Sequence, residues 1–126
     1  KIVNKIDIND PIILIHCGIG HVSCITNKYE LYLFGWNQHY QCGYPINITS
    51  VKAPRKLEFN HDIINIKCGG NHNIIETEGN QLYAFGQNED AQCLQITYES
   101  HISTPRHISI QHIKSKINND NTIIDY

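Results

Sequence analysis

The sequence predicts an all-β fold, in which four-stranded antiparallel blades of a β-propeller follow one another along the chain. The main observation is an internal repeat: residues 12–62 recur from residue 63 onward at a constant shift of fifty-one positions, and seventeen of the fifty-one positions are identical. Each copy contains four short apolar runs, and neither shows helical periodicity over a useful length. Four-stranded units that repeat about every fifty residues are typical of propellers, whose sheets bury their faces against the neighbouring sheets.

The first copy contains four candidate strands. An apolar run that starts at Ile12 ends at Gly18, which suits a strand covered on both faces. The polar segment 27–30 predicts a hairpin turn, and a long polar connection extends from Trp36 to Ala53. Pro54 opens the last run, and a proline at the head of a strand suits the edge of a sheet. We expect the four strands at residues 12–17, 21–26, 31–34 and 54–59.

The second copy repeats this plan, with strands expected at residues 63–68, 72–77, 81–85 and 105–110. Residues 1–10 match the end of the first copy and predict the last strand of a preceding blade. Residues 113–126 predict the start of a degenerate third unit. The expected division is therefore 12–62 for the first full repeat and 63–112 for the second, within one incomplete propeller. Such a segment, expressed alone, is expected to associate or to fold poorly, because open blade faces expose apolar strands.

The composition argues against several classes of partner. The net charge is −2, charged residues make up 17% of the chain, and Lys and Arg form no run. We therefore expect no direct contact of this segment with nucleic acid or membrane. The five cysteines include two pairs at equivalent repeat positions, which lie about one blade apart and too far for a disulfide. Reduced thiols indicate an intracellular protein, either cytoplasmic or nuclear.

A metal site is the sharpest chemical candidate in the sequence. Cys17, His21 and Cys24 form a compact cluster of the ligand types that zinc prefers. The second copy keeps Cys68 and His72 but lacks the third ligand, so the repeat persists without it. We therefore predict no metal and no cofactor, and assign Cys17 and His21 to the turn that starts each blade.

Catalysis is not indicated either. His21 and His72 could act as general bases, but a histidine that follows a glycine turn in every unit is expected to bond to a neighbouring strand. No supported nucleophile and no phosphate-binding glycine loop is present, so we predict no catalytic residues.

The unrepeated positions are better candidates for function, because the array does not need them for itself. Trp36, His39, Tyr40 and Tyr44 lie in the first long connection, where the second copy has different residues. Loops on a rigid scaffold often carry recognition, and Trp and Tyr are favoured at binding hot spots. The alternative is that one or two of these rings only cover the edge of their own sheet.

The repeated landmarks resemble those of the regulator of chromosome condensation family. They are a Cys-Gly pair and a His after the first strand, an aromatic-Gly pair and an Asn after the third, a Gln-Cys pair and a Pro-Arg pair. The sequence departs from the family at Cys42 and Cys93, where the family favours Leu, and at Leu94, where it favours Gly. The landmarks that we assign to structure are Cys17, Gly18, His21, Phe34, Gly35, Pro54, Cys68, Gly69, His72, Phe85, Gly86 and Pro105.

The resemblance implies a propeller that binds other proteins, and we predict a protein-interaction module in signalling or regulation. An alternative is guanine-nucleotide exchange on a small GTPase of the Ran or Rho type, which is the activity of the founding member toward Ran. In that member an inserted β-wedge takes part in exchange, and neither copy here has an insertion. A second alternative is a structural subunit of a large assembly.

Overall fold

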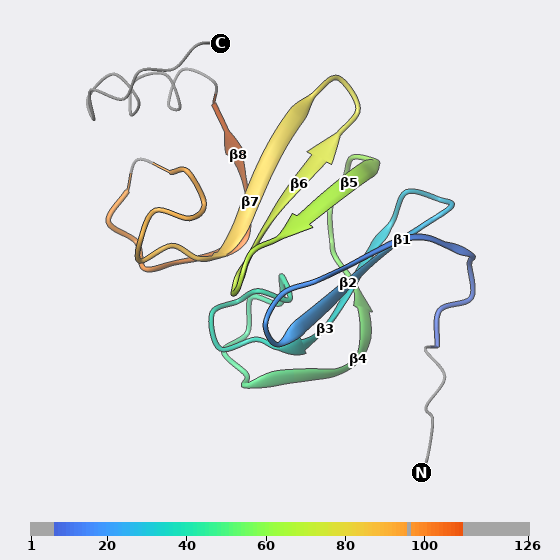
Figure 1. Cartoon of the computed structure of the whole chain (residues 1–126), viewed down its shortest axis with the longest axis horizontal. Helices are drawn as coiled ribbons and strands as arrows, with labels where there is room; N and C mark the ends of the chain where they lie inside the picture. The colour runs from blue at the N-terminus through green and yellow to red at the C-terminus, as the bar shows by residue number, and fades with distance from the viewer. Residues whose placement is uncertain (1–6, 96, 110–126) are drawn as a thin grey trace.

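Two four-stranded antiparallel sheets make up the computed structural model, which describes residues 7–95 and 97–109 (Figure 1). In both sheets each strand pairs with the next one along the chain. The all-β architecture of successive propeller blades is therefore confirmed. The first blade consists of β1 (Ile12–Cys17), β2 (His21–Thr26), β3 (Leu31–Trp36) and β4 (Ser50–Lys56), and the second of β5 (Ile63–Cys68), β6 (His72–Thr77), β7 (Gln81–Gln87) and β8 (His101–Ile108).

The third and fourth strands differ from their expected bounds. β3 continues through Gly35 to Trp36, because Gly35 adopts a φ of 112° that lets the strand bulge without ending. β4 begins at Ser50 and ends before Phe59, so the prediction that Pro54 heads this strand was wrong. Pro54 instead lies between Val51 and Arg55, where the pairing with β3 shifts register. A residue without an amide hydrogen is tolerated at such a bulge on an edge strand. Pro105 lies at the same point of β8, between its paired residues Ile102 and Arg106.

The two predicted hairpin turns form between the second and third strand of each blade. Thr26 donates its main-chain N–H to the carbonyl oxygen of Glu30 at 3.0 Å and closes the first turn. Tyr29 has a φ of 60°, the left-handed region that an L-residue with a large side chain rarely adopts. The equivalent residue of the second blade is Asn80, also at 60°, which tolerates this region better. The first turn is therefore the more strained of the two.

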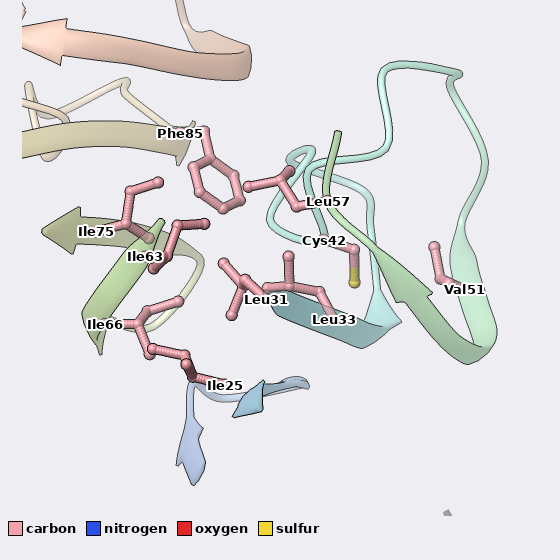
Figure 2. Packing of buried hydrophobic residues seen from close by; sticks show 10 residues of the cluster. All are labelled: Ile25, Leu31, Leu33, Cys42, Val51, Leu57, Ile63, Ile66, Ile75 and Phe85. Atoms are coloured by element: carbon pink, nitrogen blue, oxygen red, sulfur yellow. The ribbon is translucent and has the colours of Figure 1, made fainter. Parts of the chain in front are cut away.

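The core lies between the two sheets (Figure 2). β5 of the second blade contacts both β1 and β2 of the first. The first sheet contributes side chains from β2, β3 and β4, and Figure 2 shows Ile63, Ile66 and Phe85 of the second sheet facing them. The members of this cluster are Ile25, Leu31, Leu33, Cys42, Val51, Leu57, Ile63, Ile66, Ile75 and Phe85.

A second apolar cluster belongs to the second blade alone and contains Ala84, Cys93, Ile102 and Ile108. These residues are the repeat equivalents of Leu33, Cys42, Val51 and Leu57, which the first blade uses in the core between the sheets. The same repeat positions are therefore buried in both blades.

The division into repeats 12–62 and 63–112 stays a prediction, with β1–β4 inside the first range and β5–β8 inside the second. The strand expected within 1–10 falls mostly outside the described residues, and the third unit expected at 113–126 lies outside them entirely. The described residues contain no helix that is both long and apolar enough to span a membrane.

Candidate functional site

The Cys-Gly-x-x-His motif forms the turn between the first two strands of each blade. Gly18 donates its main-chain N–H to the carbonyl oxygen of His21 at 2.9 Å, and Gly69 does the same to His72 at 2.9 Å. In both turns the histidine ring lies so close to the glycine that a Cβ at the glycine would overlap the ring. The glycine of the motif therefore makes room for its histidine.

His21 connects the two blades. Its Nε2 lies 2.7 Å from Oδ1 of Asn73, and both residues are fully buried. Because an amide oxygen only accepts, Nε2 carries the proton in this contact. Nδ2 of Asn73 donates in turn to the main-chain oxygen of Gln41 at 2.6 Å. Burial lowers the pKa of His21, so the neutral ring is favoured, and burial also lowers the pKa of His72.

The candidate metal ligands Cys17, His21 and Cys24, for which the sequence predicts no metal, are not brought together as a ligand set. Cys17 is exposed, Cys24 is fully buried, and Nε2 of His21 is bonded to Asn73. Burial raises the pKa of Cys24 and so disfavours the thiolate that binds metals. Burial raises the pKa of Cys42 and of Cys93 to about 12.

The long connection after β3 is held by Asn37, a repeated landmark whose role was not evident from the sequence. Its Oδ1 accepts the main-chain N–H of Cys42 at 3.1 Å, and its Nδ2 donates to the carbonyl oxygen of Tyr44 at 3.2 Å. Oδ1 of Asn88 accepts the equivalent bond after β7, from the N–H of Cys93 at 3.1 Å, and its Nδ2 donates to the carbonyl oxygen of Glu99 at 3.0 Å. One buried amide therefore orders each loop from inside.

Gln41 docks the first of these loops against the second blade. It is fully buried, and its Oε1 accepts the main-chain N–H of His39 at 2.8 Å. Its Nε2 donates to Oδ1 of Asn71 at 3.4 Å, while its carbonyl oxygen accepts from Asn73. The segment that carries His39 is thus fixed on a rigid base, as recognition loops commonly are.

The four predicted loop residues separate into two groups. Tyr44 is half-buried, packs against the core between the sheets, and lies under the guanidinium group of Arg55 at 3.9 Å. Trp36 ends β3 with 53% of its surface exposed. The rings of His39 and Tyr40 are half-buried and contact His101 of the second blade, with centroid distances of 5.1 and 5.7 Å. His39 and Tyr40 thus lie beside the second blade. Tyr44 packs against the core between the sheets, and the Trp36 ring lies against Gly20 of its own blade.

Two matches to family models cover the middle of the chain. Both are described as the regulator of chromosome condensation (RCC1) repeat, and they match residues 30–75 and 63–92. Together they span half of the chain and include parts of both blades. The chain belongs to the regulator of chromosome condensation repeat family, which confirms the resemblance found in the sequence.

The relatives include proteins described as GTPase regulators. The chain is 35% identical over 91 residues to the X-linked retinitis pigmentosa GTPase regulator of Canis lupus familiaris, covering 67% of this chain and 8% of the relative. It is 30% identical over 87 residues to the homologue in Caenorhabditis elegans, covering 68% of this chain and 6% of the relative. The chain therefore spans less than a tenth of the length of these relatives.

Solved propellers share the fold. Human WBSCR16 superposes with a TM-score of 0.76 at 21% identity, over 86% of this chain and 28% of that one. Prp20p from Saccharomyces cerevisiae superposes with a TM-score of 0.75 at 19% identity, over 80% of this chain and 26% of that one. At these identities the likeness concerns the fold, and it identifies the two sheets as consecutive propeller blades.

Proposed function

We propose that these repeats are the protein-interaction module of a propeller that acts in signalling or regulation, in the cytoplasm or the nucleus. The proposed contact surface is the loop that follows β3, with Trp36, His39 and Tyr40 as contact residues and Tyr44 as their support. The observation that carries the proposal is the half-exposed Trp36 at the end of a strand, where the second blade has Gln87. A large ring held by a rigid element is a typical hot spot, because little entropy is lost when it binds.

The charge of the chain supports a protein partner over a polyanion. The net charge is −2, and the three ion pairs of the described residues each join a cation to a neighbouring carboxylate. A surface of this kind lacks the basic patch that nucleic acid binding requires. The proposed module has no catalytic residue within these two blades.

The test is recovery of bound partners by the intact protein, purified from the cells that make it. Trp36→Ala and Tyr40→Ala should each lower the amount of the co-purified partner at least tenfold, while the unfolding midpoint stays close to wild type. Tyr29→Ala is the matched control, because Tyr29 is also exposed but lies in the turn at the opposite end of β3. Unchanged partner recovery with both loop variants would overturn the proposed surface.

Guanine-nucleotide exchange on a small GTPase is the second candidate. It is supported by the descriptions of relatives: two are GTPase regulators, and a mouse relative that is 26% identical over 86 residues is described as an RCC1-like G exchanging factor-like protein. Prp20p, which shares the fold, is described as binding Gsp1p and histones. Any β-wedge of the kind known from the founding member would have to lie outside these two blades.

Release of labelled GDP separates the two candidates. The intact protein is incubated with GTPases of the Ran and Rho types, and exchange predicts release well above the uncatalysed rate. No acceleration with any of them would eliminate exchange and leave the interaction module. A partner that stays stoichiometric and never dissociates would instead support the third candidate, a structural subunit of an assembly.

A further inference from the structure

Three side chains with metal-binding groups converge where the loops of the two blades meet. His39 comes from the β3–β4 loop of the first blade, whereas Glu89 and His101 come from the β7–β8 loop and the first residue of β8 in the second. One ligand atom of each residue lies within 4.8 Å of the other two. Within residues 7–95 and 97–109 no other group of three His, Cys, Asp or Glu side chains meets this condition.

We propose that His39, Glu89 and His101 bind one divalent transition-metal ion, with Zn²⁺ as the best match. Two imidazoles, one carboxylate and a water form a ligand set that zinc uses in proteins. Imidazole-rich sites also favour zinc and copper over magnesium and calcium, which prefer all-oxygen ligands.

The distances fit this assignment after a small movement. Nδ1 of His39 and Nε2 of His101 are 2.9 Å apart, and the two rings are stacked with an interplanar angle of 22°. Zinc–nitrogen bonds of about 2.0–2.1 Å at a tetrahedral angle place two ligand nitrogens about 3.3 Å apart. The rings therefore need to separate by only a few tenths of an ångström, and the exposed Glu89 can rotate to complete the set.

The surroundings hold the two imidazoles in a suitable orientation. Nδ1 of His101 lies 2.9 Å from Oγ of Ser100, and when Nδ1 donates to this hydroxyl the lone pair of Nε2 is free to bind the ion. The main-chain N–H of His39 is bonded to the buried Gln41, which fixes the position of the loop. The rings of Tyr40 and His101 pack edge-to-face at a centroid distance of 5.7 Å.

None of the three ligands is a repeat landmark. The equivalent of His39 is Asp90, and the equivalents of Glu89 and His101 are Gln38 and Ser50. The repeat therefore does not require these histidines, and their convergence is specific to this pair of blades. A bound ion would cross-link the blades beside Tyr40. The inference does not rest on the proposed function, because binding of the ion is measured without any protein partner.

The experiment is a calorimetric titration of the chelator-treated intact protein with Zn²⁺, together with its thermal unfolding midpoint. We expect one equivalent of Zn²⁺ that is lost in His101→Gln, and a midpoint that rises with Zn²⁺ in the wild type but not in His101→Gln. His61→Gln is the matched control, since His61 is exposed and belongs to no such ligand group. A His61→Gln protein that loses the same equivalent would overturn the assignment.

Glu89→Gln keeps the test decisive if a histidine variant fails to fold. Glu89 is exposed, so its replacement should leave the metal-free midpoint unchanged while the affinity for Zn²⁺ falls at least tenfold. Wild-type protein that takes up no Zn²⁺ would show that the two histidines form a hydrogen bond between blades and nothing more, and the proposal would fail. Unchanged affinity in Glu89→Gln would likewise refute the three-ligand site.

Discussion

Replacing Gly35 by Ala tests why each blade needs an aromatic-Gly pair at the end of its third strand. Gly35 has a φ of 112°, which an L-residue rarely adopts. A Cβ there would also overlap the carbonyl oxygen of Gly20 and lie 2.9 Å from Cα of His21. Both are main-chain atoms, and the same carbonyl accepts the N–H of Trp36 at 2.8 Å, so it cannot move without breaking that bond.

The expected loss of stability is the sum of two effects. Holding a non-glycine residue in this backbone region costs about 1–3 kcal/mol. Forcing an extra methyl group into packed atoms costs about 1–3 kcal/mol more. We therefore expect Gly35→Ala to lower the free energy of unfolding by about 4 kcal/mol.

Gly79→Ala is the matched control for this prediction. Gly79 also has a positive φ, 79°, but a Cβ there would meet no atom within 4 Å. Gly79→Ala should therefore lower the free energy of unfolding only by the cost of the positive φ, about 1–2 kcal/mol. Urea unfolding of the intact protein measures both variants, and a slope of about 1–3 kcal/mol per molar urea separates their midpoints by about 1 M or more. Equal midpoints would refute the argument that the close approach of Gly20 requires glycine at position 35.

Three further predictions concern turns, the contact between blades, and pH. Tyr29→Asn should raise the free energy of unfolding by about 1 kcal/mol, because asparagine tolerates the φ of 60° better; a lower urea midpoint would contradict it. Asn73→Leu should lower the free energy of unfolding by about 4 kcal/mol, because the buried ring of His21 and the main-chain oxygen of Gln41 lose their hydrogen-bond partner. Urea unfolding measures this loss, and a value below about 1 kcal/mol would show that solvent or relaxation replaces those bonds. Burial lowers the pKa of His21 and of His72 in the folded state. Their contribution to stability is therefore complete above pH 6.5 and falls as the pH drops, because the unfolded chain then binds protons more readily than the folded chain. The urea midpoint should therefore be lower at pH 5.5 than at pH 7.5, and an unchanged or higher midpoint at pH 5.5 would contradict this sign.

The strands were predictable from the sequence wherever an apolar run is bounded by polar turns. The runs of β1, β2, β5 and β6 agree with the bounds in the structure. β4 was placed too late because Pro54 looked like a boundary. In the structure the strand passes through the proline at a register shift, and a bulge has no hydrophobic signature.

The polar contacts between the blades could not be predicted by comparing equivalent positions of the two repeats. His21 bonds to Asn73, the equivalent of Val22, so the contact joins positions that the repeat does not pair. His39 and His101 are likewise at unrelated positions, 62 residues apart, and meet only because the two loops leave the same end of neighbouring blades. These polar contacts depend on the tertiary structure and on residues that occur in one copy only. A comparison of the two copies with each other cannot predict them.

The two blades share their apolar positions but not their buried polar residues, and this difference indicates how neighbouring blades select each other. Ile66 is 1% exposed against the first blade, whereas its equivalent Ile15 is 55% exposed on the far side of that blade. Apolar contacts of this type are common to both copies and would fit any neighbour. The bond from His21 to Asn73 is different, because the first blade has Val22 where the second has the asparagine, and a valine could not accept it. A buried polar pair that is satisfied by only one neighbour disfavours other pairings, because a wrong neighbour would leave its groups without partners. The shared residues therefore build a blade, and the unshared polar residues specify which blade lies beside it.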